Sequence, residues 1–148
     1  FSGKVFTIPS SKINFHYRST DLPNNLIYLS GTFKGTYRSK DLIKKKIDEL
    51  KYKKETTQPL RVKTSGSTFK NPISQTKRKV WELIRESIDI NEVNSMFGHA
   101  KLSEKHCNFL INQEKASSKD MKNLIKFIRE NVYKKTGVTL ELEIVLTS

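Results

Sequence analysis

"SSKDMKNLIKFIRENVYKKTGVTLELEIVL", residues 117–146, decides the fold class, because it predicts a helix followed directly by a strand. Ser117 and Asp120 form a capping box that begins the helix, and Gly137 ends it in a left-handed conformation. Between these ends, apolar residues recur with helical spacing: Met121, Leu124, Ile125, Ile128 and Val132. The helix therefore presents one apolar face to a core.

The strand expected at residues 138–146 alternates strictly. One face carries Val138, Leu140, Leu142, Ile144 and Leu146, and the other carries Thr139, Glu141, Glu143 and Val145. A helix that covers the apolar face of such a strand predicts an α+β fold, a small mixed sheet with helices packed on one face.

Two more helices are expected upstream. The first covers residues 39–54, is capped by Ser39, and carries an apolar stripe of Leu42, Ile43, Ile47 and Leu50. The second covers residues 78–88 and turns four side chains inward: Val80, Trp81, Ile84 and Ile88.

Short β-branched and aromatic runs predict the remaining strands. They lie at residues 97–103 and 108–112, and at 4–8 and 24–35 in a β-rich segment that covers residues 1–36. The opening "FSGKVFTIP" has strand-like alternation and no initiator Met, so we expect the chain to begin inside an element of a larger protein.

Composition and charge bound the function. The chain has 148 residues, with 28 Lys and Arg against 15 Asp and Glu, for a net charge of +13. This balance favours anionic partners such as phosphorylated metabolites, nucleic acid or acidic lipid. Cys107 is the only cysteine, which excludes an internal disulfide and favours the reducing cytoplasm. No apolar run is long enough to suggest a membrane span, and no signal peptide is apparent.

The Lys-rich helix at 39–54 has two interpretations. It is either a solvated helix face or a surface for phosphate or nucleic acid. No helix-turn-helix, zinc-finger or RNA-binding motif accompanies it, so no nucleic acid is expected. His16, His99 and His106 lie far apart and none has metal-ligand spacing, so no metal is expected either; Cys107 is interpreted as a small buried hydrophobe.

Several polar residues are candidates for a site. In "TSGSTFKNP", residues 64–72, the hydroxyl of Ser67, the cation of Lys70 and the amide of Asn71 could receive a polar anionic ligand, or Ser67 could simply bond to its own turn. Arg18 could clamp a carboxylate or phosphate, or lie on the surface. Glu143 has a shifted pKa if its face is covered and is an ordinary solvated carboxylate if it is open.

Taken together, these pieces resemble the UDP-N-acetylenolpyruvoylglucosamine reductases (UDP-N-acetylmuramate dehydrogenases) of bacterial cell-wall synthesis. The resemblance covers nearly the whole chain in family order: "YRS" at 17–19, "QPL" at 58–60, "GSTFKNP" at 66–72, "SEKHCNFLIN" at 103–112, "SSKD" at 117–120 and "GVTLELEI" at 137–144.

The resemblance implies an oxidoreductase in which NADPH reduces bound FAD, and the reduced flavin passes a hydride to the enolpyruvyl group of a UDP-sugar. It implies that Ser67 protonates the intermediate, and that Arg18 and Glu143 complete the catalytic set. Tyr17 and Arg18 would lie near the flavin. The implied substrate contacts are Asn71 and, by position, His106 and Lys54.

The resemblance also implies a division of the chain. Residues 1–36 are similar to the end of the FAD-binding domain, and residues 37–148 to the substrate-binding domain. The Gly-rich phosphate loop of the FAD-binding half does not occur here, so we expect the chain alone to be inactive. Two alternatives stay open at this point: a non-catalytic basic module that binds RNA or another anionic partner, and a degenerate relative that keeps only the fold.

Overall fold

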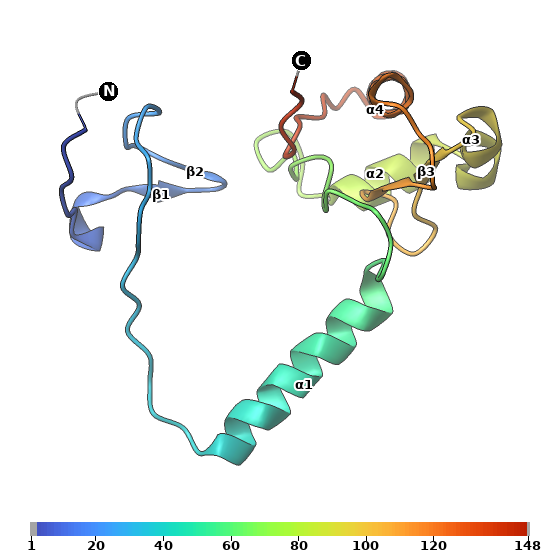
Figure 1. Cartoon of the computed structure of the whole chain (residues 1–148). Coiled ribbons are helices and arrows are strands. Elements are labelled where there is room, and N and C mark those ends of the chain that lie inside the picture. Colours follow the sequence, from blue (N-terminus) through green and yellow to red (C-terminus); the bar gives the residue numbers. More distant parts are fainter. Residues whose placement is uncertain (1–2, 148) are drawn as a thin grey trace. The chain divides into compact units, whose positions relative to one another are not determined.

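The computed structural model describes residues 3–147, and it divides the chain into two compact units, Phe1–Arg38 and Ser39–Ser148. The expected start inside an element falls partly on Phe1 and Ser2, which lie outside the described residues. The assignment of 1–36 to a flavin-binding domain and of 37–148 to a substrate-binding domain stays a prediction. Figure 1 shows the order of the elements along the chain.

The first unit contains less β-structure than the sequence predicts. It has a short 3-10 helix, Ser10–Lys12, and a two-stranded antiparallel sheet of β1 (Phe15–His16) and β2 (Ser19–Thr20). The strands expected at 4–8 and 24–35 are wrong for the described residues, where these segments carry no strand assignment. Their large side chains, Val5, Phe6, Ile27 and Tyr28 among them, are exposed. Strand preference reflects packing against neighbours, and the described unit gives these side chains little to pack against.

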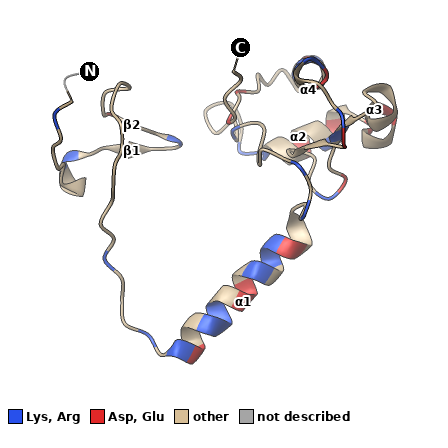
Figure 2. Ribbon diagram, in the orientation of Figure 1, with Lys and Arg blue, Asp and Glu red and all other residues tan. Residues whose placement is uncertain are grey.

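The second unit begins with the helix that the sequence predicts at 39–54. This helix, α1, spans Lys40–Thr57, and its N-cap Ser39 accepts a hydrogen bond from the backbone N–H of Leu42 at 3.4 Å. The helix has no buried residue, so its apolar stripe is exposed. Lys46 follows Leu42 and precedes Leu50 by four residues each, so a cation lies within the same helix face. Figure 2 shows how densely Lys residues cover α1.

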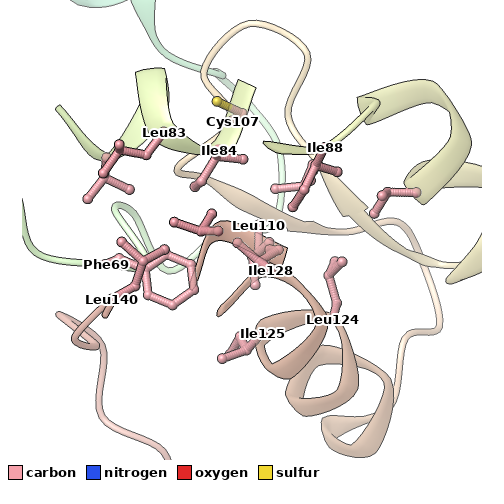
Figure 3. Packing of buried hydrophobic residues seen from close by; sticks show 14 of the residues in the cluster. Phe69, Leu83, Ile84, Ile88, Cys107, Leu110, Leu124, Ile125, Ile128 and Leu140 are labelled. Atoms are coloured by element: carbon pink, nitrogen blue, oxygen red, sulfur yellow. The ribbon is translucent and has the colours of Figure 1, made fainter. Parts of the chain in front are cut away.

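The core of the second unit forms between helices and a small sheet. The helices α2 (Val80–Ser87) and α4 (Ser118–Thr136) pack on each other, and α4 also contacts β3 (Ala100–Leu102). β3 pairs antiparallel with β4 (Leu110–Asn112). Figure 3 shows side chains from α2, β4 and α4 meeting those of Phe69 and Leu140 in one cluster. Its buried members include Phe69, Leu83, Ile84, Leu110, Leu124, Ile128 and Leu140. The expected strands at 97–103 and 108–112 are thereby confirmed.

The long helix is confirmed in detail. Ser117 and Asp120 form the capping box of α4, and Gly137 ends it with φ of 71°, a left-handed conformation that favours glycine. Four of its predicted apolar residues are buried, and the fifth, Met121, packs against the core: the buried four are Leu124, Ile125, Ile128 and Val132.

The region before β3 differs from the prediction. In α2, Trp81 is exposed, and Leu83 takes its place in the core beside Val80 and Ile84. Val80, Leu83 and Ile84 are spaced by three and four residues and share one helix face, whereas Trp81 follows Val80 directly and points to a different side. A further helix, α3 (Ile90–Met96), was not predicted; Asp89 caps it by accepting from the N–H groups of Asn91 and Glu92.

The C-terminal segment is extended but not a strand. The expected strand at 138–146 is wrong, because only Leu142 forms a bridge, antiparallel to Phe69. The burial alternation holds near its start, where Val138 and Leu140 are buried. The segment opposite carries only isolated bridges, which is too little to build a regular ladder. The α+β class is confirmed, and within residues 3–147 its β part is two two-stranded antiparallel sheets.

Candidate active site

Ser67 lies in a segment that is held on two sides. Its neighbour Gly66 has φ of 87°, a conformation that disfavours any side chain. Ser67 forms an antiparallel bridge with Phe109, and the N–H of Thr68 donates to the carbonyl of Asn108 at 2.8 Å. On the other side, Phe69 bridges Leu142. The backbone of residues 67–69 therefore bridges two other segments, one at Phe109 and the other at Leu142.

Glu143 lies on the segment next to Ser67. Its backbone N–H donates to the carbonyl of Thr68 at 2.9 Å. Glu143 is half-buried, whereas Glu141 is exposed and pairs with Lys70 at 3.8 Å between Nζ and Oε2. An exposed pair of this kind contributes little to stability. The structure thus places the backbone of Glu143 beside the segment that carries Ser67.

His106 enters the same neighbourhood from the loop before β4. Its ring packs edge-on against Phe109, with centroids 4.9 Å apart, and its Nδ1 accepts from the N–H of Asn108 at 3.4 Å. Burial lowers the pKa of His106 below its ordinary value of 6.5, because a charged imidazolium would lose solvation there. A neutral ring that accepts at Nδ1 carries its proton at Nε2.

Cys107 follows His106 and belongs to the core. Its thiol is buried and donates to the carbonyl of Trp81 at 3.1 Å. Burial raises the pKa of the Cys107 thiol, so a reactive thiolate is disfavoured. The interpretation of Cys107 as a small buried hydrophobe is confirmed.

Asn71 and Lys54 occupy different settings. The side-chain oxygen of Asn71 accepts from the N–H of Val80 at 3.1 Å, which caps the first turn of α2 and ties the "KNP" turn to that helix. Lys54 lies in the last turn of α1, and its carbonyl accepts from the N–H of Gln58. Lys105 donates to the carbonyl of Glu55, so the end of α1 reaches the loop that precedes His106.

Tyr17 and Arg18 form the turn of the hairpin in the first unit. Arg18 has φ of 62°, and its guanidinium lies 5.0 Å from the centroid of the Tyr17 ring. This geometry presents a planar cation on an aromatic face, a setting that suits a carboxylate or phosphate. Each unit is described by itself, so a shared site of Arg18 with Ser67 and Glu143 stays a prediction.

Asn108, which the sequence did not predict as a site residue, binds the backbone of the segment that carries Ser67. The side chain of Asn108 accepts from the N–H of Phe69 at 3.0 Å and donates to the carbonyl of the same residue at 2.9 Å. Asn108 is buried. Its signal in the sequence is an amide inside the otherwise apolar end of "KHCNFLIN", because a buried amide needs partners for both of its polar atoms.

An apolar groove lies elsewhere in the second unit. Ile125, Leu140 and Leu142 line it, and Lys122, Lys126 and Arg129 of α4 lie along it. None of the predicted site residues is among its lining residues. The backbone contacts around Ser67, and not this hollow, are the better guide to chemistry, since they bring the polar candidates together.

Residues 3–147 lack two features that would bear on metals and membranes. No cluster of three or more His, Cys, Asp or Glu side chains there could hold a metal ion. Within the same residues, no helix combines the length and apolarity that crossing a bilayer requires.

Fold and site together define an α+β domain in which a serine and a glutamate come from adjacent extended segments under a helical layer. Residues 58–147 match the family model of the UDP-N-acetylenolpyruvoylglucosamine reductase C-terminal domain. The chain belongs to this family.

Curated relatives agree with that membership. The chain is 53% identical over 143 residues to a UDP-N-acetylenolpyruvoylglucosamine reductase of Pelagibacter ubique (strain HTCC1062), which covers 97% of this chain and 46% of the relative. It is 40% identical over 144 residues to the reductases of Rickettsia massiliae (strain Mtu5) and Rickettsia conorii (strain ATCC VR-613 / Malish 7), again over 97% of this chain and 47% of each relative. The chain spans about half the length of the curated relatives it matches.

Proposed function

We propose that the intact protein reduces the enolpyruvyl ether of UDP-N-acetylglucosamine to UDP-N-acetylmuramate, a step of peptidoglycan precursor synthesis in the cytoplasm, with FAD and NADPH. Membership of the reductase family supports the reaction class. The observation that carries the assignment to this chain is the hydrogen bond between the Glu143 N–H and the Thr68 carbonyl, which joins the segments of two catalytic candidates.

The reaction adds a hydride and a proton across a carbon–carbon double bond conjugated to a carboxylate. The bound flavin, once NADPH has reduced it, would supply the hydride. Hydride addition leaves enolate-like charge on the substrate, and Ser67 donates the proton to the basic carbon in a fixed geometry. Glu143, in its protonated form, donates a hydrogen bond to the developing charge. The half-buried position of Glu143, on a segment whose backbone bonds to Thr68, supports this role.

Arg18 and Tyr17 fit the anionic end of this chemistry. The guanidinium offers a planar set of donors for the substrate carboxylate, and it lies 5.0 Å from the centroid of the Tyr17 ring. The sequence of this chain has no Gly-rich phosphate loop, so the residues that hold the flavin phosphates belong to another part of the intact protein. We therefore expect the chain alone to be inactive.

His106, Asn71 and Lys54 are the proposed substrate contacts. A neutral His106 that accepts at Nδ1 offers Nε2–H as a donor to a sugar or phosphate oxygen. The side-chain oxygen of Asn71 caps the start of α2, so a substrate contact made by Asn71 would also be linked to that helix. Lys54 would add a cation for the diphosphate.

Ser67→Ala in the intact protein tests the assignment. NADPH should reduce the flavin at the wild-type rate, while reoxidation by the enolpyruvyl substrate should slow by roughly 10²–10⁴-fold, the usual contribution of a positioned acid. Ser65→Ala is the matched control, because Ser65 is exposed and two residues away. Equal slowing of both half-reactions would contradict the role of Ser67.

A second candidate is a basic module that binds RNA or another polyanion without catalysis. The Lys-covered surface of α1 favours it (Figure 2). Nothing in the sequence supplies base-reading chemistry, so such binding would depend on phosphate alone.

A further inference from the structure

Asn108 holds the segment that carries Ser67 through a two-point contact with one residue. Its Oδ1 accepts from the Phe69 N–H at 3.0 Å, and its Nδ2 donates to the Phe69 carbonyl at 2.9 Å. In a sheet, a neighbouring strand would satisfy both groups. Here the bridge between Phe69 and Leu142 uses the polar groups of the neighbouring Thr68 and Lys70, and the N–H and carbonyl of Phe69 itself go to the side-chain amide of Asn108 instead of to a second strand.

The backbone of Asn108 adds a third contact to the same segment. Its carbonyl accepts from the Thr68 N–H at 2.8 Å, so one residue binds the backbone of both residues that follow Ser67. Asn108 and Phe69 are buried, and the fork is therefore shielded from water. A hydrogen bond in such surroundings resists displacement and fixes the backbone on which it acts.

We infer that Asn108 is a positioning residue for the proton transfer from Ser67: its amide fork fixes the 67–70 backbone and so the hydroxyl relative to the reacting carbon. The inference rests on the proposed function. It concerns only the step that uses Ser67, and reduction of the flavin by NADPH does not depend on it. A displacement of about 1 Å at a reacting group can cost about 10²-fold in rate.

Asn108→Asp in the intact protein removes one arm of the fork and keeps the other. The carboxylate still accepts from the Phe69 N–H, but it opposes the Phe69 carbonyl with an oxygen instead of a donor. We expect flavin reduction by NADPH to be unchanged and reoxidation by the enolpyruvyl substrate to slow by about 10–10²-fold at pH near 8.

The pH profile separates positioning from general damage. A buried carboxyl has a raised pKa, and its protonated form can donate to the Phe69 carbonyl and restore the fork. The oxidative half-reaction of Asn108→Asp should therefore recover as the pH is lowered. The adjoining segments carry other titratable groups: His106, Cys107, Lys70, Glu141 and Glu143. Because the wild type carries the same groups, the recovery is measured as the ratio of the reoxidation rate of the variant to that of the wild type at each pH.

Asn112→Asp is the matched control. Asn112 makes the same kind of fork on another backbone: Oδ1 accepts from the Ala116 N–H at 3.0 Å, and Nδ2 donates to the Ala116 carbonyl at 3.1 Å. This variant suffers the same chemical change in the same unit, yet Ala116 lies outside the Ser67 segment. Its two half-reactions should keep wild-type rates.

Asn108→Ser removes the fork without adding charge, and it serves where Asn108→Asp proves too unstable to assay. It should slow reoxidation similarly and show no recovery at low pH. In the double variant with Ser67→Ala, loss of the fork should add no further slowing, because Asn108 acts through Ser67.

The outcomes separate the inference from the function on which it rests. If Ser67→Ala slows reoxidation but both Asn108 variants react like the wild type, the positioning role is wrong and the function stands. If Ser67→Ala has no effect, the proposed role of Ser67 is wrong. If Asn112→Asp slows reoxidation as much as Asn108→Asp, the effect is general damage and the positioning role is contradicted.

Discussion

At the residue scale, the Thr68 hydroxyl stands out because it is fully buried beside Ser67 and has no hydrogen-bond partner among the described residues. Leaving a buried hydroxyl unsatisfied costs about 1–3 kcal/mol. Thr68→Val, which has nearly the same shape, should therefore raise the free energy of unfolding by about 1 kcal/mol, measured by urea unfolding of the chain.

Thr136→Val is the control for this prediction. The Thr136 hydroxyl donates to the Val132 carbonyl at 2.7 Å and accepts from the Val138 N–H at 3.2 Å. The same replacement there should lower the free energy of unfolding by about 1 kcal/mol. Destabilisation of similar size in both variants would show that the Thr68 hydroxyl is bonded in solution.

His106 gives the fold a dependence on pH. Its folded pKa lies below 6.5, the value of an exposed histidine, so between the two values the unfolded chain binds more protons. The stability from the neutral ring is complete above about pH 6.5 and is lost as the pH falls through that value toward the folded pKa. The urea concentration at the unfolding midpoint should decrease as the pH is lowered from about 7.5 to about 5.5, and His106→Gln should make this decrease smaller.

His99→Gln is the comparison for His106, since it removes another histidine and leaves His106 in place. The slope that this variant keeps is the slope of a chain that still carries His106. A His106→Gln variant whose slope equals that of the wild type would contradict the assignment of the pH dependence to this ring.

Sequence reasoning at this scale succeeded where a residue's role is local. Cys107 as a buried hydrophobe and Ser117 as a cap follow from side-chain chemistry and short-range spacing. The fork of Asn108 could not be predicted this way, because its partner Phe69 lies 39 residues earlier and only the packed fold brings the two together. Residue chemistry made Arg18, Ser67 and Glu143 candidates, the family resemblance implied their catalytic roles, and their joint action stays a prediction.

At the element scale, α4 has the most complete set of local signals. The Ser117 hydroxyl accepts from the Asp120 N–H at 3.2 Å, and the Asp120 carboxylate accepts from the Ser117 N–H at 2.9 Å. The Ser117 hydroxyl also donates to the Asp120 carboxylate at 2.7 Å, and this bond together with the one from the Ser117 N–H holds the pKa of Asp120 below its usual range. Ser117→Ala should lower the free energy of unfolding by about 1 kcal/mol, measured by urea unfolding.

Ser118→Ala is the matched control for the cap. Ser118 is the first residue of α4 and is exposed, so its replacement should change stability by less than about 0.5 kcal/mol. Equal effects of the two variants would mean that the capping box contributes nothing specific.

Elements that depend on neighbours were the ones that the sequence mispredicted. Alternation at 138–146 is correct for Val138 and Leu140, yet a ladder needs a partner of equal length, which the Phe69 segment does not provide. The apolar stripe of α1 has helical spacing but no burial, because spacing specifies a face and not what covers it. The helix α3 is short and polar, so its periodicity was too weak to detect.

At the scale of the whole molecule, the net charge of +13 is compatible with both candidate functions, and the salt dependence of RNA binding distinguishes them. If α1 only attracts anions generally, binding to single-stranded RNA should weaken steeply as salt rises, with a log–log slope set by the number of phosphates contacted. Lys44, Lys45 and Lys46 lie in one turn of α1, and changing all three to Gln should reduce that slope.

The charge prediction has a clear control in the enzyme assay. The same triple replacement in the intact protein should leave NADPH oxidation with enolpyruvyl substrate essentially unchanged, since these residues are not proposed contacts. Tight RNA binding that survives physiological salt and is lost in the triple variant would favour the basic module over the reductase.

The central claim is that this chain supplies the substrate side of a flavin-dependent reduction, and a single-turnover measurement on the intact protein tests it most directly. The flavin is first reduced with NADPH without oxygen, and the enolpyruvyl ether of UDP-N-acetylglucosamine is then mixed in while flavin absorbance is followed. The account predicts that absorbance returns at a rate that saturates with substrate, with one UDP-N-acetylmuramate formed per flavin. A flavin that NADPH reduces but that the enolpyruvyl ether never reoxidises would contradict it.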